Sequence, residues 1–246
     1  MNSRVNLDNK EAVVLHHHDY RNSSQIVHFF VNDYGKVSAV AKGVKQSKKQ
    51  TFSLLQPFQK LTISLTGKHE LLTLKNVEAT TVQWKLNGKS LYCAYYINEL
   101  LLRLLPSHTD CQEIFKLYDS ALSLLFQCSV QGAVSYELPL RLFELKLLEF
   151  LGYGLNLNHE INSGKALEAD KQYHYIIDSG PSEQAPSSVK SLAISGTTLR
   201  ALEKVDFSEQ KTLQESKQLL KWALAEHLGD KPLKSRELFK QLYCQN

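Results

Sequence analysis

The sequence predicts an α+β protein, with a small β-barrel at the N-terminus and a mainly α-helical region after it. Up to about residue 82, apolar and polar residues alternate along short segments, which is the period of half-buried strands. Beyond that point apolar residues recur every three or four positions, as on a buried helix face. The 246 residues, 43% of them apolar, can form two domains of ordinary size. We expect these domains at residues 1–82 and 83–246.

Five short strands are expected in the first domain, at residues 12–16, 25–31, 37–42, 61–65 and 71–77. The segment Asn32-Asp33-Tyr34-Gly35 supplies a hairpin turn, because Asn, Asp and Gly accept positive φ. Closing such strands into a barrel removes their unpaired edges. The OB-fold is the five-stranded barrel that often binds oligonucleotides, and an SH3-like barrel fits the same pattern.

Helical periodicity predicts six helices in the second domain, at residues 91–105, 110–127, 136–151, 196–202, 212–228 and 235–242. Pro106 ends the first, Asp110 is the expected N-cap of the second, and Gly152 and Gly229 follow the third and fifth as C-terminal glycines. Residues 154–190 are rich in Asn, Gly, Pro and Ser. They are expected to form an irregular insert with one strand at 172–177.

Positive charge is concentrated in one stretch, although the whole chain carries only +4. Residues 34–69 contain seven lysines and no Asp or Glu, and residues 43–51 read as a mobile basic loop between two strands. Such a segment suits a polyanion such as nucleic acid, or it is simply solvated. The residues expected to contact phosphates are Lys36, Lys42, Lys45, Lys48 and Lys49, together with Lys234 and Arg236 from a smaller C-terminal cluster.

Aromatic residues near the basic stretch could stack on bases, namely Tyr20, Tyr34, Phe52 and Phe58. Some of them will instead be core residues, and Phe58 is the strongest candidate because it follows Pro57.

The sequence shows no catalytic or metal-binding pattern. It contains no phosphate-binding G-x-x-x-x-G-K-[ST] or G-x-G-x-x-G motif. The four cysteines lie far apart without a C-x-x-C pair, which favours reduced thiols over a zinc site. Residues His16, His17 and His18 fit a strand surface better than a metal site, because neighbours in a strand point to opposite faces. We therefore expect no enzymatic activity, metal or cofactor.

Neither a signal peptide nor a membrane-spanning run is present, since no stretch approaches the roughly 20 apolar residues that a span needs. We expect a cytoplasmic protein.

Several short segments resemble the bacterial recombination mediator family RecO. They occur in the right order over nearly the whole chain: Val14-Leu-His16, Tyr20 to Ser24, Gly35-Lys-Val37, Val40-Ala-Lys-Gly43, Leu55-Gln-Pro-Phe58, Glu70-Leu-Leu-Thr-Leu74, Tyr96-Ile-Asn-Glu-Leu100, Arg141-x-Phe-Glu144, Leu151-Gly-Tyr-Gly154 and Lys231-Pro-Leu-Lys-Ser-Arg-Glu-Leu238.

This resemblance implies an N-terminal OB domain and a helical C-terminal domain. It implies a protein that binds single- and double-stranded DNA, anneals complementary strands without ATP, and works with RecR to load RecA onto DNA coated by the single-strand binding protein SSB. It also implies a bacterial cytoplasmic protein, associated with the nucleoid during repair and monomeric in solution. Many members carry a four-cysteine zinc module in the region matching 154–190. This chain has no cysteine there and resembles the zinc-free branch.

The resemblance further implies that the acidic tail of SSB docks on the helical domain with help from an arginine, which here is Arg141. A guanidinium beside an apolar groove can hold a terminal carboxylate. Alternatively, Arg141 pairs with Glu137 or Glu144 on its own helix. The rival function is a protein-interaction adaptor that does not touch DNA, and a hydrolase or nuclease is a distant third.

Overall fold

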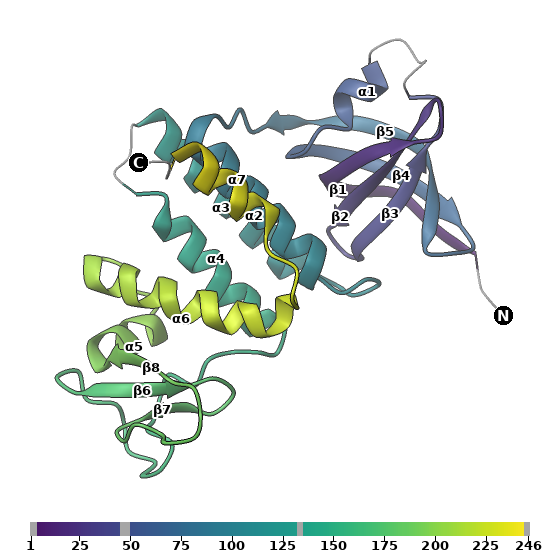
Figure 1. The fold of residues 1–246 in the computed structure, drawn as a ribbon. Coiled ribbons are helices and arrows are strands. Elements are labelled where there is room, and N and C mark those ends of the chain that lie inside the picture. Colours follow the sequence, from purple (N-terminus) through teal and green to yellow (C-terminus); the bar gives the residue numbers. More distant parts are fainter. Residues whose placement is uncertain (1–3, 45–49, 132–134, 244–246) are drawn as a thin grey trace. The chain divides into compact units, whose positions relative to one another are not determined.

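Five strands at the N-terminus close into a barrel (Figure 1). They are β1 (Val5–Tyr20), β2 (Ser24–Val31), β3 (Gly35–Ala41), β4 (Gln59–Gly67) and β5 (Leu71–Gln83). The order around the barrel is β1-β2-β3-β5-β4, and β4 pairs with β1 to complete it. All neighbours are antiparallel except β3 and β5, which pair in parallel. This five-stranded closed arrangement is the OB-fold, so the expected fold class is confirmed.

The computed structural model describes residues 4–44, 50–131 and 135–243, and within these the side chains of 50 and 81–83 are left aside. The chain forms two compact units, Met1–Ala133 with Pro232–Asn246, and Val134–Lys231. Among the described residues, the barrel thus shares the first unit with four helices: α1 (Gln50–Leu54), α2 (Gly88–Leu104), α3 (Gln112–Val130) and α7 (Lys234–Tyr243).

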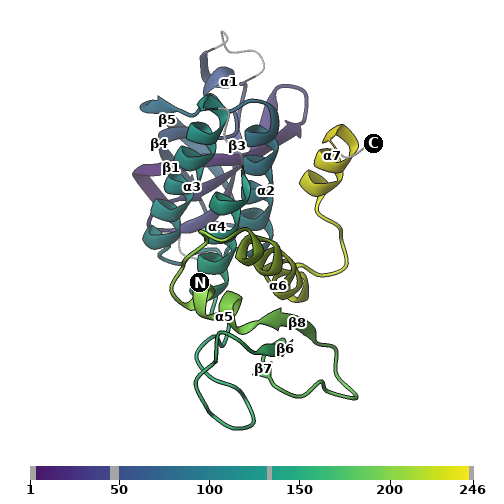
Figure 2. The same ribbon diagram turned by 90° about the vertical axis from the view of Figure 1, so that its left-hand side faces the viewer.

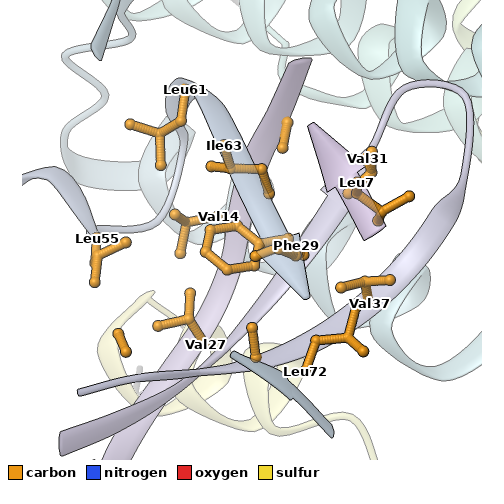
Figure 3. Packing of buried hydrophobic residues seen from close by; sticks show 14 of the residues in the cluster. Leu7, Val14, Val27, Phe29, Val31, Val37, Leu55, Leu61, Ile63 and Leu72 are labelled. Carbon is orange, nitrogen blue, oxygen red and sulfur yellow. The ribbon is translucent and has the colours of Figure 1, made fainter. Parts of the chain in front are cut away.

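Alternate residues of the strands fill the barrel interior. Phe29, Val14, Val27 and Ile63 meet near its centre and are fully buried (Figure 3). Burying such side chains stabilises the fold by about 1.5–3 kcal/mol each. A bulge between Val14 and His16 shifts the register of β1 against β2.

A second apolar layer lies between the outside of the barrel and the helices. Phe30, which points away from the interior, packs on Phe115 of α3 with ring centroids 5.1 Å apart. Asn98 of α2 donates to the Leu15 carbonyl of β1 and accepts from the Tyr118 hydroxyl of α3, both at 2.8 Å. These buried hydrogen bonds join α2 to β1 and α3 to α2. Figure 2 shows the two helices lying over the barrel.

Three expected details of the first unit need comment. Asp110 lies one residue before the N-cap of α3, which is Cys111, but its carboxylate still accepts the Gln112 N–H at 3.1 Å. The basic loop expected at 43–51 falls largely on residues 45–49, outside the described part of the chain, and α1 begins at Gln50. Phe58 is buried, as expected, and contacts the ring of Tyr95.

The described residues of the second unit form three helices and a small antiparallel sheet. The helices are α4 (Glu137–Phe150), α5 (Gly196–Glu203) and α6 (Gln210–Leu228), and the strands are β6 (Gln172–Ile176), β7 (Gly180–Ser182) and β8 (Leu192–Ser195). The strand order is β7-β6-β8. α4 packs on α6, and β8 lies against α5 and α6 (Figure 2). Within the insert expected at 154–190, the predicted strand is present as β6, β7 is the one addition among the described residues, and the remaining residues form neither helix nor strand.

Candidate nucleic-acid interface

The outward face of β2 and β3 is where OB-folds bind oligonucleotides. Since Val27, Phe29, Val37 and Ala39 fill the interior, the residues between them project outward. The expected phosphate contact Lys42 is exposed directly after β3. Lys45, Lys48 and Lys49 lie outside the described residues.

Lys36 projects from β3 toward the end of α2. Its ammonium donates to the Leu102 carbonyl at 2.7 Å, and burial lowers its pKa. Leu102 is in the last turn of α2, whose carbonyls have no partner within the helix. Lys36 therefore stabilises the C-terminus of α2 in addition to any contact with a phosphate.

The C-terminal pair Lys234 and Arg236 is placed by α7, which packs on α2. The Glu99 carboxylate of α2 accepts the backbone N–H groups of Lys234 at 3.0 Å and Ser235 at 2.9 Å, and the Ser235 hydroxyl at 2.6 Å. The helix dipole of α7 also stabilises a carboxylate at its N-terminus. The Lys234 side chain remains exposed.

Arg236 is held against the aromatic ring of Tyr96. Its guanidinium carbon lies 4.9 Å from the ring centroid and its Nη2 donates to the Tyr96 hydroxyl at 2.8 Å. The guanidinium is half-buried, so part of its donor capacity is used within the protein.

Three histidine side chains lie together on the outward face between these basic residues. His16 and His28 are directly paired across β1 and β2, and His18 is two residues further along β1. The ring centroids are 6.1 Å apart for His16 and His28, 5.5 Å for His18 and His28, and 6.2 Å for His16 and His18. The planes differ by only 14° to 29°. We refer to His16, His18 and His28 as the imidazole cluster.

The imidazole cluster lies near both basic regions, that of Lys36 and that of Lys234, which are about 200 residues apart in the sequence. Burial, together with His16, His18 and Lys36, lowers the pKa of His28 to about 4. Burial, His17, His18 and Lys234 lower the pKa of His16. Lys36 and Lys234 thus both lie close enough to act on this one cluster.

The sequence indicated surface histidines here, but not that three of them meet in one cluster. The spacing of His16 and His18 places them on one face of a strand, but nothing local shows that His28 joins them. In the described part of the chain, no group of three or more His, Cys, Asp or Glu side chains is arranged to hold a metal ion.

Arg141 lies in α4, in the other unit from the barrel. Its Nη2 donates to Glu144 Oε1 at 2.7 Å, and the two side chains are only 5% and 1% exposed. This is the pairing that the sequence left open as the alternative, whereas Glu137 pairs with Lys217 of α6 at 2.5 Å. A carboxylate from a partner would have to compete with Glu144 for the guanidinium.

Comparison with known proteins shows to which family the chain belongs. Residues 5–83 match the model described as recombination protein O N terminal, and residues 86–237 match recombination protein O C terminal. The chain belongs to the RecO family. It is 42% identical to "DNA repair protein RecO" of Nitrosococcus oceani over 94% of this chain and 92% of the relative. Proteins of the same name from Methylococcus capsulatus and Psychromonas ingrahamii are 40% and 39% identical over 97% and 96% of this chain, and 94% and 99% of those relatives.

The two RecO family models meet where the barrel ends. The N-terminal model stops at residue 83, the last residue of β5, and the C-terminal model begins at 86, just before α2. In the structure α2, α3 and α7 nevertheless belong to the same compact unit as the barrel. Among the helices of the described residues, none has the length and apolar character needed to cross a bilayer.

Proposed function

We propose that this RecO-family chain is a non-enzymatic mediator of DNA repair and homologous recombination. It binds single- and double-stranded DNA, anneals complementary strands without ATP, and with RecR helps to load RecA onto SSB-coated DNA. It acts as a monomer in the bacterial cytoplasm, at the nucleoid during repair. The DNA-binding part of this function is supported by an OB barrel whose outward β1–β2–β3 face bears the imidazole cluster, with the exposed lysines Lys42 and Lys234 on the same face.

Annealing follows from the chemistry of these contacts. Lysine neutralises phosphates without reading bases, so two strands of any complementary sequence can be held close together. Each phosphate contact to single-stranded DNA contributes about −0.7 to the slope of log affinity against log salt. Exposed Lys42 and Lys234 are the described lysines best placed to contribute.

The deciding experiment is annealing of complementary oligonucleotides by the purified chain, without ATP or added metal, over a salt titration. The proposal requires annealing that weakens steeply with salt. Absence of both annealing and DNA binding at low salt would refute it.

The SSB tail contact is proposed for the region around Arg141. A tail carboxylate would replace Glu144 as the partner of the guanidinium, while exposed Leu138 on the first turn of α4 offers apolar surface nearby. Arg141→Ala should abolish binding of an acidic tail peptide and retain DNA binding.

That variant needs a matched control, because removing the cation from a buried ion pair costs about 3–5 kcal/mol. In Arg141→Met with Glu144→Gln, both charges are removed together. Loss of peptide binding in this folded double variant supports the site, and full peptide binding would exclude it.

A second candidate function is a protein-interaction adaptor that does not touch DNA. The observation in its favour is that Lys36 and Arg236, two of the expected DNA contacts, already bind groups within the protein. Binding of SSB or RecR by a chain that fails to bind DNA would establish it.

A further inference from the structure

The imidazole cluster is part of a row that crosses four strands on the outside of the barrel. His16 of β1 is paired with His28 of β2, His28 with Ser38 of β3, and Ser38 with Leu71 of β5. The strands of this row run side by side in Figure 1. His16 and His18 at one end of the row are exposed, and Leu71 at the other end is 40% exposed. The row is therefore accessible to a ligand at both ends.

The rings of the row are oriented alike and one of them is held in place. The three imidazole planes lie within 29° of one another. His28 Nδ1 is hydrogen-bonded to Ser38 Oγ at 2.8 Å, which fixes the rotation of that ring. The three rings are stacked on one another, and a base can extend such a stack with a further flat ring.

The surroundings keep the central ring uncharged. His28 is half-buried and lies within the electrostatic influence of His16, His18 and Lys36, while His16 lies within that of His17, His18 and Lys234. Each of these neighbours opposes a proton on the ring that it influences, and burial does so too. An uncharged imidazole binds phosphate poorly but offers a flat aromatic ring. The neighbouring lysines bind phosphates better, because they are charged.

We propose that His16, His18 and His28 form a stacking surface for unpaired nucleobases, with the phosphates of the same strand directed toward Lys234 on one side and Lys42 on the other. This subsite rests on the proposed DNA-binding function and adds to it a preference for single strands, because paired bases expose no ring face. It also gives an annealing protein a place to present bases before they pair.

The test compares His18→Gln, His18→Tyr and the control His159→Gln. His18 is exposed, so replacing it leaves the barrel core intact, and His159 is an exposed histidine of the second unit. Binding of an oligothymidine and of a duplex is measured for each variant at pH 7.5 over a salt series. Thermal unfolding of each variant confirms that it is folded.

Loss of one stacked base corresponds to about fivefold or more in affinity. We expect that loss for His18→Gln on the single strand, little change on the duplex, and an unchanged salt slope. His18→Tyr keeps a flat ring that cannot become a cation, and it should retain single-strand binding. His159→Gln should behave as wild type.

Three results would overturn the inference or its basis. If wild type binds neither DNA, the proposed function itself fails. If wild type binds but His18→Gln binds the single strand equally well, the stacking surface is refuted. If both His18 variants lose affinity and the salt slope becomes shallower, the imidazoles act as cations and the stacking surface is also refuted.

Discussion

The docking of α7 depends on one carboxylate, and its removal gives a prediction whose size the structure allows us to work out. Glu99 accepts three hydrogen bonds from the first turn of α7, two from backbone N–H groups and one from the Ser235 hydroxyl. In Glu99→Gln one oxygen can still accept, but the new NH₂ group faces an N–H donor. The variant therefore loses one charge-assisted hydrogen bond and the charge–dipole attraction.

The expected cost is about 1–2 kcal/mol, from values for hydrogen bonds to charged groups and for helix caps. Because α7 is the last described helix, this cost should appear as local opening rather than global unfolding. Hydrogen exchange of the amides of residues 234–243 should accelerate about 5- to 30-fold. Glu203→Gln, which removes an exposed acid at the end of α5, serves as the control for lost negative charge.

DNA binding by Glu99→Gln tests the same contact, because the lost charge and the lost docking of α7 change the affinity in opposite directions. Removal of a negative charge by itself would tighten binding to a polyanion. Undocking of α7, in contrast, disperses Lys234 and Arg236 and should weaken binding. Unchanged exchange in 234–243, or tighter DNA binding by Glu99→Gln, would show that this carboxylate does not position the C-terminal basic residues.

Three further predictions concern acid stability, the buried network and the lysines. Burial alone would raise the pKa of Glu160, but its hydrogen bonds to neighbouring backbone and side-chain groups outweigh burial and lower it to about 2. Its stabilising effect is thus present above pH 4.5 and lost as the pH falls toward 2. Glu160→Gln should flatten the acid unfolding curve in that range, and a curve identical to wild type would contradict this. Asn98→Ala should lower the free energy of unfolding by about 2–4 kcal/mol in urea titrations, because it leaves two buried groups without a hydrogen bond. Tyr118→Phe, which removes only one of those bonds, should cost less, and an equal loss would argue against the network. Lys42→Gln should reduce the salt slope of single-stranded DNA binding by about 0.7, whereas Lys36→Met should lower stability by about 1 kcal/mol and leave the slope unchanged. A changed slope in the latter variant would make Lys36 a phosphate ligand.

The sequence predicted where the strands lie but not how far they extend. Alternation located all five barrel strands, yet β1 runs from Val5 to Tyr20 and not only over 12–16. Its first half includes Asn6, Asp8 and Asn9, polar residues that lower strand propensity. Asn6 is accommodated because residues Val5 to Leu7 pair with β4, which is a tertiary contribution, whereas Asp8 and Asn9 lie where the register against β4 shifts and Asn9 has a positive φ.

In the second unit, the strand predicted at 172–177 is confirmed as β6, but β7 and β8 were not predictable, for the same reason. β7 consists of Gly180-Pro181-Ser182 and β8 of only four residues, so neither contains enough alternation to be recognised. Each is a strand because β6 lies beside it. By contrast, the ends of α4 and α6 were correctly placed from Gly152 and Gly229, since positive φ at a helix end is a local requirement.

What the sequence by itself determined was the set of residue types and their local periods: a basic strand region, five alternating segments, amphipathic helices and a likeness to RecO. The tertiary structure decided which groups meet. Only the tertiary structure gave the strand order, in which β1 pairs with β4 and β3 pairs in parallel with β5. Only the folded chain shows that Lys36 reaches Leu102, that Arg141 is buried against Glu144, and that His16 faces His28. These contacts join residues distant in sequence or set by strand register and packing, and no local pattern encodes them.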